Sequence, residues 1–265
     1  MEQEGLIRLS IFFGLFFVFA ATEYIFPRRV IVKGKARRWI TNWSITILNT
    51  LTLRLFSVAL PLLAIGAAFD AQNLNVGFFN RINFSYWVEF LLVILILDFA
   101  IWLQHLLTHK IGFLWRIHRV HHSDTQMDVS TAIRFHPIEI ALSLVLKIGL
   151  VYALGADPLS ILFFEILLNG SSMFNHANIK IPTRIDKVLR LFIVTPDMHR
   201  IHHSSDRNEH DTNFGFALSV WDRFFRTYKD YPQTKHEDME LGLNWQDEKP
   251  ERLGWSLALP FRKNE

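Results

Sequence analysis

Long apolar runs alternate with short polar stretches along the chain. Five runs are long and apolar enough to be interpreted as membrane helices, and they cover residues 6–26, 43–69, 88–107, 138–155 and 159–176. The last two are shorter and are separated by Gly155 and Pro158, which predicts a helical hairpin. The first run is longer than the apolar region of a cleavable signal peptide. The pattern therefore predicts an all-α, polytopic membrane bundle of about four to five membrane helices.

Charges beside and within these runs set the expected orientation. Residues 28–38 carry six Lys or Arg side chains and no acid, which places this loop in the cytoplasm and the N-terminus outside. Arg54, within the second run, could snorkel, pair with an acid or meet a lipid head group, and the sequence leaves all three open. Asp98, within the third run, is either a functional acid that bonds a histidine of another helix or a structural partner of Arg54.

Histidines are concentrated at one end of these expected helices. Eight of the twelve histidines form one HxxxH and two HxxHH boxes, namely His105 and His109, then His118, His121 and His122, then His199, His202 and His203. Residues three and four apart share a face of a helix, and neutral imidazole is the commonest metal ligand near neutral pH. Because one tetrahedral ion uses only four ligands, eight imidazoles indicate two neighbouring ions. With five passes and the N-terminus outside, every box lies on the cytoplasmic side.

Composition narrows the chemistry of this metal site. Half of the residues are hydrophobic, 24 are Phe and none is Cys. The absence of cysteine excludes disulfides, thiolate zinc sites, iron–sulfur clusters and c-type haem attachment. A formal charge of +3 is too small to suggest nucleic-acid binding, and the basic residues beside apolar runs are typical of membrane flanks.

Further polar residues near the boxes are candidates for the same site. His176 ends the fifth run on the side of the boxes and is expected to be a ligand, whereas His136 is either a ligand or a hydrogen-bonded histidine before a proline. Thr195 and Pro196 predict a helix start just before the third box. His210 and His236 are expected to face solvent. Asp98, Asp197 and Asp222 are the preferred acids for orienting imidazole N–H groups, and the other candidates are Asp124, Asp128, Glu139 and Asp206.

The order of the boxes on a multi-pass chain resembles the fatty acid hydroxylase/sterol desaturase superfamily. Supporting motifs are Asp98 before the first box, Arg134-Phe-His136-Pro137, Phe174-x-His176-Ala-Asn178, Thr195-Pro-Asp-Met-His199, Asn213-Phe-Gly215 and Trp221-Asp222-Arg223. The resemblance implies membrane helices capped by a cytosolic helical region that holds two iron ions on the three boxes and His176. The chain departs from the family at Arg226, where Gly is usual, and at Ser172, where fatty-acid 2-hydroxylases have a further histidine. His136 is a candidate to replace that histidine as a ligand.

The resemblance and the residues together predict a membrane di-iron oxygenase that hydroxylates or desaturates a C–H bond of a lipid such as a sterol or a fatty acyl chain, using O2. The high-valent oxidant must come from the metal, and the chain has no dinucleotide or haem motif, so an external electron donor of cytochrome b5 or ferredoxin type is expected. Zinc can displace iron at such a site.

Two other functions stay open. One is a membrane zinc hydrolase, which would need a general base such as Glu beside its ligands, but no box of this chain contains a Glu. The other is a non-enzymatic metal or haem carrier. The expected domains are an N-terminal membrane region (1–84), a catalytic domain (85–230) and a polar tail (231–265). The expected location is a bacterial inner membrane, because no terminal dilysine signal is present.

Overall fold

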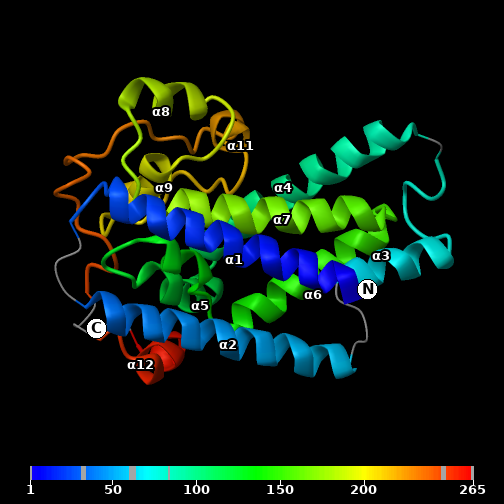
Figure 1. Cartoon of the computed structure of the whole chain (residues 1–265), viewed down its shortest axis with the longest axis horizontal. Coiled ribbons are helices and arrows are strands. Elements are labelled where there is room, and N and C mark those ends of the chain that lie inside the picture. The colour runs from blue at the N-terminus through cyan, green and yellow to red at the C-terminus, as the bar shows by residue number, and fades with distance from the viewer. Residues whose placement is uncertain (1, 31–33, 60–63, 83, 246–248, 264–265) are drawn as a thin grey trace.

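Long helices form one part of the molecule, and short helices cap one end of it (Figure 1). The structure is a computed structural model that describes residues 2–30, 34–59, 64–82, 84–245 and 249–263. The long helices are α1 (Glu2–Ile25), α2 (Lys35–Ala59), α4 (Tyr86–Lys110), α6 (Pro137–Leu154) and α7 (Pro158–His176). The shorter elements are α3 (Ala64–Asn73), α5 (Gly112–His122), η1 (Val129–Ile133), α8 (Thr183–Leu189), α9 (Pro196–His202), α10 (Arg207–His210), α11 (Val220–Phe224), α12 (Leu253–Ala258) and η2 (Leu259–Phe261).

The described residues contain no β-strand, and the predicted all-α membrane bundle is confirmed. Among the described residues, three helices are long and apolar enough to cross a membrane, and these are Gly5–Ile25, Tyr86–Lys110 and Pro137–Leu154. The expected second run is represented by α2 and α3, and its continuity lies outside the described residues, because it depends on residues 60–63. Large apolar side chains cover the outside of the long helices; Phe17, Leu55 and Trp87 are each at least 70% exposed, as lipid-facing residues are.

The predicted hairpin joins α6 to α7. Gly155 ends α6 in the left-handed conformation, with φ of 66°, and the Asp157 carboxylate accepts hydrogen bonds from the backbone N–H groups of Leu159 and Ser160 at the start of α7. A Cβ on Gly155 would lie 2.7 Å from the carbonyl oxygen of Val76, so this turn also needs glycine to let the segment after α3 approach closely.

The basic loop after α1 packs against the cap. Arg28 forms an ion pair with Asp197 at 3.0 Å, and the buried Arg38 lies between Asp124 (2.7 Å) and Asp128 (2.8 Å). The side chains that predicted a cytoplasmic loop therefore contact the end of the molecule that carries the histidine boxes.

Segment 249–263, which was expected to belong to a polar tail, packs on the cap. Trp255 and Leu259 are buried against Val120, and Arg119 donates to the carbonyl oxygen of Leu259 at 2.6 Å. Nothing tests the expected division into three domains, which stays a prediction.

Arg134 joins this C-terminal segment to the rest of the cap. Its buried guanidinium donates to the carbonyl oxygens of Val120 (2.9 Å) and Pro250 (2.9 Å) and to the side chains of Asn42 (2.7 Å) and Ser256 (2.7 Å). Burial lowers the pKa of Arg134 to about 10, which still leaves it charged at neutral pH. The Arg134 guanidinium therefore connects its own segment with α2, α5 and the C-terminal segment.

Arg134→Met is expected to destabilise the protein by about 3 kcal/mol or more, because it leaves several buried acceptors without a donor. The measurement is the melting temperature of detergent-purified protein. The control is Arg184→Met, the same change at an exposed position of α8, which should melt with the wild type. Equal melting of the two variants would contradict a structural role for Arg134.

Candidate metal centre

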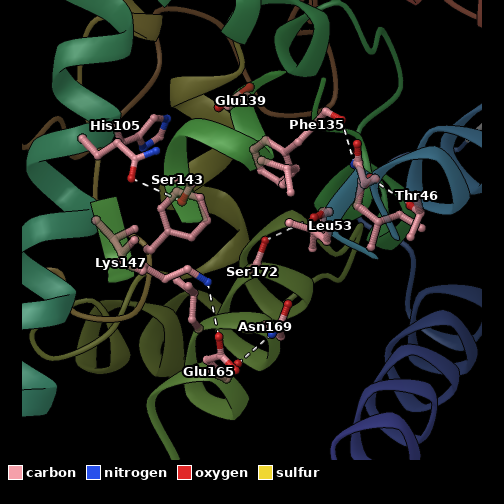
Figure 2. A pocket seen from close by; sticks show the side chains of 18 of the residues that line it. Thr46, Leu53, His105, Phe135, Glu139, Ser143, Lys147, Glu165, Asn169 and Ser172 are labelled. Carbon is pink, nitrogen blue, oxygen red and sulfur yellow. Dashed lines mark hydrogen bonds and ion pairs between the residues drawn. The ribbon is translucent and has the colours of Figure 1, made fainter. Parts of the chain in front are cut away.

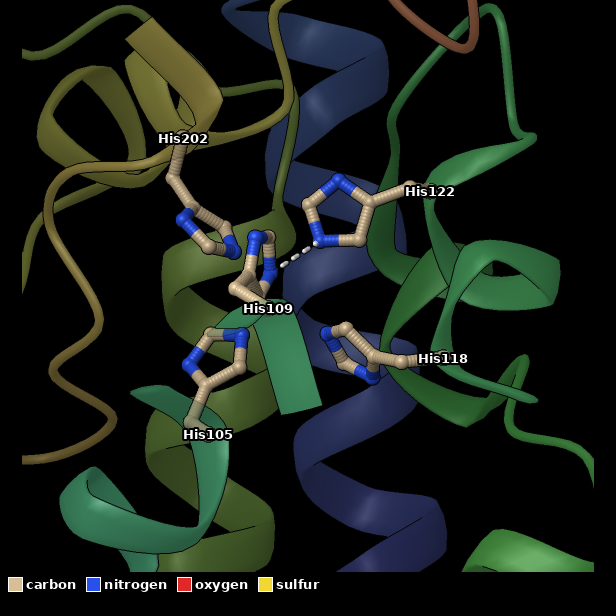
Figure 3. A group of neighbouring side chains, drawn as sticks. All are labelled: His105, His109, His118, His122 and His202. Carbon is tan, nitrogen blue, oxygen red and sulfur yellow. Dashed lines mark hydrogen bonds between the residues drawn. The ribbon is translucent and has the colours of Figure 1, made fainter. Parts of the chain in front are cut away.

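Nine buried histidines form two adjacent groups. The first group contains His105, His109, His118, His122 and His202, and the second contains His121, His176, His199 and His203. Within each group the ligand nitrogens lie within 4.8 Å of one another. In Figure 3 the rings of the first group converge on a common centre from three directions. The two groups touch, since the rings of His122 and His203 stack with centroids 4.5 Å apart.

The HxxHH boxes explain how the two groups form. Successive residues of a helix point about 100° apart, whereas residues four apart nearly share a direction. On α5, His118 and His122 therefore enter the first group, while His121 enters the second. On α9 the same spacing is used in reverse, because His199 and His203 belong to the second group and His202 to the first. Each box thus supplies both groups.

The remaining histidines of the two groups lie at the ends of other helices. The HxxxH pair of α4 lies in its last two turns, and His176 is the last residue of α7. The start of α9 is as predicted, since the Thr195 hydroxyl accepts from the backbone N–H of Met198 at 3.4 Å and Pro196 is the first helical residue.

Nitrogen separations in the second group match those of ligands on one ion. The Nε2 atom of His176 lies 3.0 Å from Nε2 of His121, and 3.2 Å from Nε2 of both His199 and His203. Two nitrogens at metal-ligand distance from one ion, at angles between octahedral and tetrahedral, are about 2.9–3.4 Å apart. Hydrogen bonds cannot explain all three contacts, because an imidazole nitrogen either donates one proton or accepts at one lone pair.

Four histidines have their Nδ1 proton fixed. Nδ1 of His105 donates to the carbonyl oxygen of Phe214 (2.7 Å), Nδ1 of His176 to that of Ser172 (2.7 Å) and Nδ1 of His202 to that of Thr212 (2.8 Å). Nδ1 of His118 donates to the carboxylate of Glu139 (2.6 Å). A carbonyl oxygen only accepts, so Nε2 of each carbonyl-bound ring keeps its lone pair for a metal.

Burial and protonation both favour metal binding. Within the described part of the chain, Nε2 of His105, His118 and His202 is buried without a hydrogen-bond partner. Burial lowers the pKa of His121, His122, His199, His202 and His203 well below its usual range, and neighbouring imidazoles lower it further. These rings are therefore neutral at neutral pH, the form that binds metal.

The three preferred acids, Asp98, Asp197 and Asp222, do not bond to the imidazoles of the two histidine groups. Asp222 accepts from the indole N–H of Trp102 (3.0 Å) and from the backbone N–H groups of Phe214 (2.9 Å) and Gly215 (2.8 Å). It thereby holds the loop whose Phe214 carbonyl orients His105, one step further from the site than expected.

Asp98 and Asp197 likewise have other partners. Asp98 accepts from the indole of Trp221 at 2.8 Å, in place of the expected histidine, and Asp197 pairs with Arg28 and Arg200. Both acids therefore join parts of the chain without touching the two groups.

The other candidate acids are divided. Glu139 does orient an imidazole, that of His118. Asp124 and Asp128 hold Arg38, and Asp206 caps α10 by accepting from the backbone N–H of Asn208.

Three further histidines lie outside the two groups. His136 caps α6, with Nδ1 accepting from the backbone N–H of Ile138 (3.2 Å) and Nε2 facing the carbonyl oxygen of Leu257 (3.3 Å), so it is the hydrogen-bonded histidine before a proline. The expectation that His210 and His236 face solvent is wrong, because both are partly buried. His210 stacks on Trp115 with ring centroids 5.2 Å apart, and His236 lies 3.9 Å from Asp197.

Sequence reasoning missed Asp211, whose carboxylate lies 3.5 Å from Nδ1 of His109. It also missed the polar residues of a cavity of about 290 Å³ that His105 lines (Figure 2). The adjacent His210 and Asp211 were the available signal for the former, and the Lys147 and Glu165 charges within apolar runs were the signal for the latter.

Together the fold and the site define a membrane helical bundle with a buried polyhistidine centre that could hold metal. A sequence model of the fatty acid hydroxylase family matches residues 90–227, just over half of the chain, and includes all nine histidines. The chain therefore belongs to this family. No solved structure matches it significantly.

Curated relatives are lipid hydroxylases. The ornithine lipid hydroxylase OlsE of Rhizobium tropici is 30% identical over 58% of this chain and 45% of its own length. Human alkylglycerol monooxygenase is 27% identical over 55% of this chain and 31% of its own. Rat cholesterol 25-hydroxylase is 27% identical over 55% of this chain and 48% of its own. The chain thus matches less than half the length of each relative.

Gly215→Ala is expected to destabilise the protein by about 1–3 kcal/mol, because the loop beside His105 is tightly packed. The added Cβ would meet Val194 at 2.8 Å and the Asp222 carboxylate at 2.9 Å. Thermal melting checks this against Gly149→Ala within α6, where a Cβ meets nothing within 4 Å. The control should stabilise the helix by about 0.5–1 kcal/mol, so shifts of the same sign would contradict the packing argument.

Proposed function

We propose that this protein is a di-iron oxygenase that hydroxylates a C–H bond of a membrane lipid. The observation that carries the proposal is the pair of buried histidine groups, in which nitrogen lone pairs converge at ligand spacing. The names of the relatives support hydroxylation over desaturation, since they are hydroxylases or monooxygenases.

The residues present fit two metal ions. One ion would be held by the first group, within which Nε2 of His109 and Nε2 of His122 lie 3.1 Å apart, and the other by the second group around His176. Iron at these positions would supply the activation of O2 that side chains cannot perform. Imidazole also binds zinc, so the metal found after purification depends on its supply.

The chain itself contributes ligand orientation and a cavity for the substrate. Glu139 holds the Nδ1 proton of His118 at 2.6 Å, and the Phe214 carbonyl holds that of His105 at 2.7 Å. These contacts fix both rings without using their Nε2 atoms. The cavity lined by His105 lies among α4, α6 and α7, each of which contributes one apolar residue (Ile101, Ile140 and Leu168) and several polar ones.

The overall reaction balances with two electrons from outside the chain. R–H, O2, two electrons and two protons give R–OH and water. The described part of the chain has no cysteine or nucleotide-binding loop to supply electrons, which supports a separate donor of cytochrome b5 or ferredoxin type.

The proposed orientation places the histidine groups in the cytoplasm of a bacterial cell, with the bundle in the inner membrane. It is supported by the contacts of Arg28 and Arg38 with the cap, because positive charges beside membrane helices favour the cytoplasmic side.

Removing either histidine group is expected to remove one ion and all product. His118→Ala/His122→Ala disables the first group, and His199→Ala/His203→Ala disables the second. Elemental analysis should find about one ion per chain in each, against about two in the wild type. O2-dependent product should be undetectable in both, since the reaction is proposed to need both ions.

The matched control is His136→Ala, a buried histidine outside both groups, which should retain both metals. Melting curves identify any variant that has simply unfolded. Product formation by either double variant would contradict the proposal. Two zinc ions that iron cannot replace, with no O2 consumption, would favour a zinc hydrolase instead.

A further inference from the structure

Two cavities border neighbouring sides of one helix, α6. The inner cavity of about 290 Å³ is lined by His105, and the outer groove of about 510 Å³ lies between α4 and α6. Residues four apart on α6 line each of them. Glu139, Ser143 and Lys147 line the inner cavity, and Leu142, Leu146 and Leu150 line the outer groove.

The two cavities share a junction. Gln104, Thr108 and Glu139 line both, and the Ser143 hydroxyl donates to Oε1 of Gln104 at 3.3 Å, which links α6 to α4 at this point. One weak hydrogen bond therefore spans the boundary between the groove and the cavity. Ser143 and His105 both line the inner cavity, and Figure 2 shows Ser143 below and to the right of His105.

The linings of the two cavities differ in polarity. Apart from the three shared residues, every residue that lines the outer groove is apolar. The inner cavity also contains Lys147, Glu165, Asn169 and Asn49. Figure 2 shows Lys147 and Glu165 at the opposite end from Glu139. The outer groove is thus suited to hydrocarbon, whereas the inner cavity mixes apolar side chains with charged and amide groups.

At the end of the inner cavity away from Glu139, the ion-paired side chains leave one positive charge in excess. Glu165 pairs with Lys147 at 3.4 Å and with Arg8 at 2.5 Å, so two cations share one carboxylate. Two acceptors that line the cavity, Oδ1 of Asn49 and Oε2 of Glu139, are buried and have no hydrogen-bond partner among the described residues. Charges at membrane depth are costly and mark substrate sites by default.

We infer that the substrate is an amphiphilic lipid whose anionic polar portion occupies the inner cavity and whose hydrocarbon chain lies in the outer groove. Lys147 pairs with the anion, and a hydroxyl or N–H of the same polar portion donates to Asn49 or Glu139. The oxidised carbon then belongs to the polar portion or adjoins it, because His105 lines only the inner cavity. Eight residues of α6 separate Lys147 from Glu139, a rise of about 12 Å, which sets the reach of the polar portion. This inference rests on the proposed function for the location of the reacting carbon.

A sterol nucleus or a plain hydrocarbon fits this arrangement poorly. Either would bury Lys147 and Glu165 against apolar surface and leave the two free acceptors without a donor, which costs about 1–3 kcal/mol for each unpaired group.

The test measures immobilisation of two nitroxide probes by electron paramagnetic resonance on zinc-loaded protein in detergent. One probe is a stearate labelled near its carboxylate, and the other is a labelled cholestane. Wild-type protein should immobilise the stearate in preference to the cholestane, and unlabelled stearate should displace it. Lys147→Met should weaken stearate binding about tenfold or more, the value of one charge-assisted hydrogen bond. Leu103→Trp, which fills the outer groove, should abolish it.

Two controls separate specific binding from lipid contact at the surface. Leu91→Trp is the same kind of change on an exposed part of α4 outside both cavities, and Lys180→Met removes an exposed lysine. Both should bind stearate as the wild type does. Equal stearate binding by Lys147→Met and wild type, or preferential binding of the cholestane, would overturn the inference.

The metal content of the same preparations separates this inference from the proposed function. Specific stearate binding by protein that takes up no metal would uphold the amphiphile site and remove the oxygenase. Metal-loaded protein without specific stearate binding would remove the amphiphile site and leave the oxygenase.

Discussion

Convergence of nine imidazole rings in a buried volume is the constraint on which the rest of the structure depends. Neutral nitrogens that face one another without protons repel, and each loses its hydrogen bonds to water. The fold must hold them in place by other contacts. Carbonyl oxygens and Glu139 fix four of the rings from behind, and Asp222 fixes the loop that supplies one of those carbonyls. A bound cation would remove the repulsion, which explains how such an arrangement is tolerated.

The cap around the histidines is held by buried cations rather than by a large apolar core. Arg38 and Arg134 are fully buried and bond to segments from α2 to the C-terminal helix. Such networks are costly unless each member is paired, so they fix one arrangement of the connected segments. The precision that metal ligands require thus comes from polar contacts at the membrane surface, while the apolar helices supply the frame and the lipid-facing exterior.

α6 links the histidine groups to the apolar groove. Its N-terminal Glu139 orients His118, its next two turns carry Ser143 and Lys147 into the inner cavity, and the neighbouring face of the helix lines the apolar groove. A lipid that enters from the bilayer would first meet the apolar side chains of the outer groove and then the charged side chains of the inner cavity. The same helix therefore relates the position of the ligands to the polarity of the substrate.

The sequence by itself determined the helical class, the hairpin at Gly155, the helix start at Thr195 and the candidate ligands, because apolar run length, turn residues and HxxHH spacing are local properties. It did not determine which rings of different helices share a group. Helical spacing separates His121 from His118 and His122, but only the packing of α4, α5, α7 and α9 decided which other histidines join each of them. The partners of Asp98, Asp197 and Asp222, the cap of His136 and the polar cavity were likewise decided by tertiary structure, because each joins residues far apart in the chain.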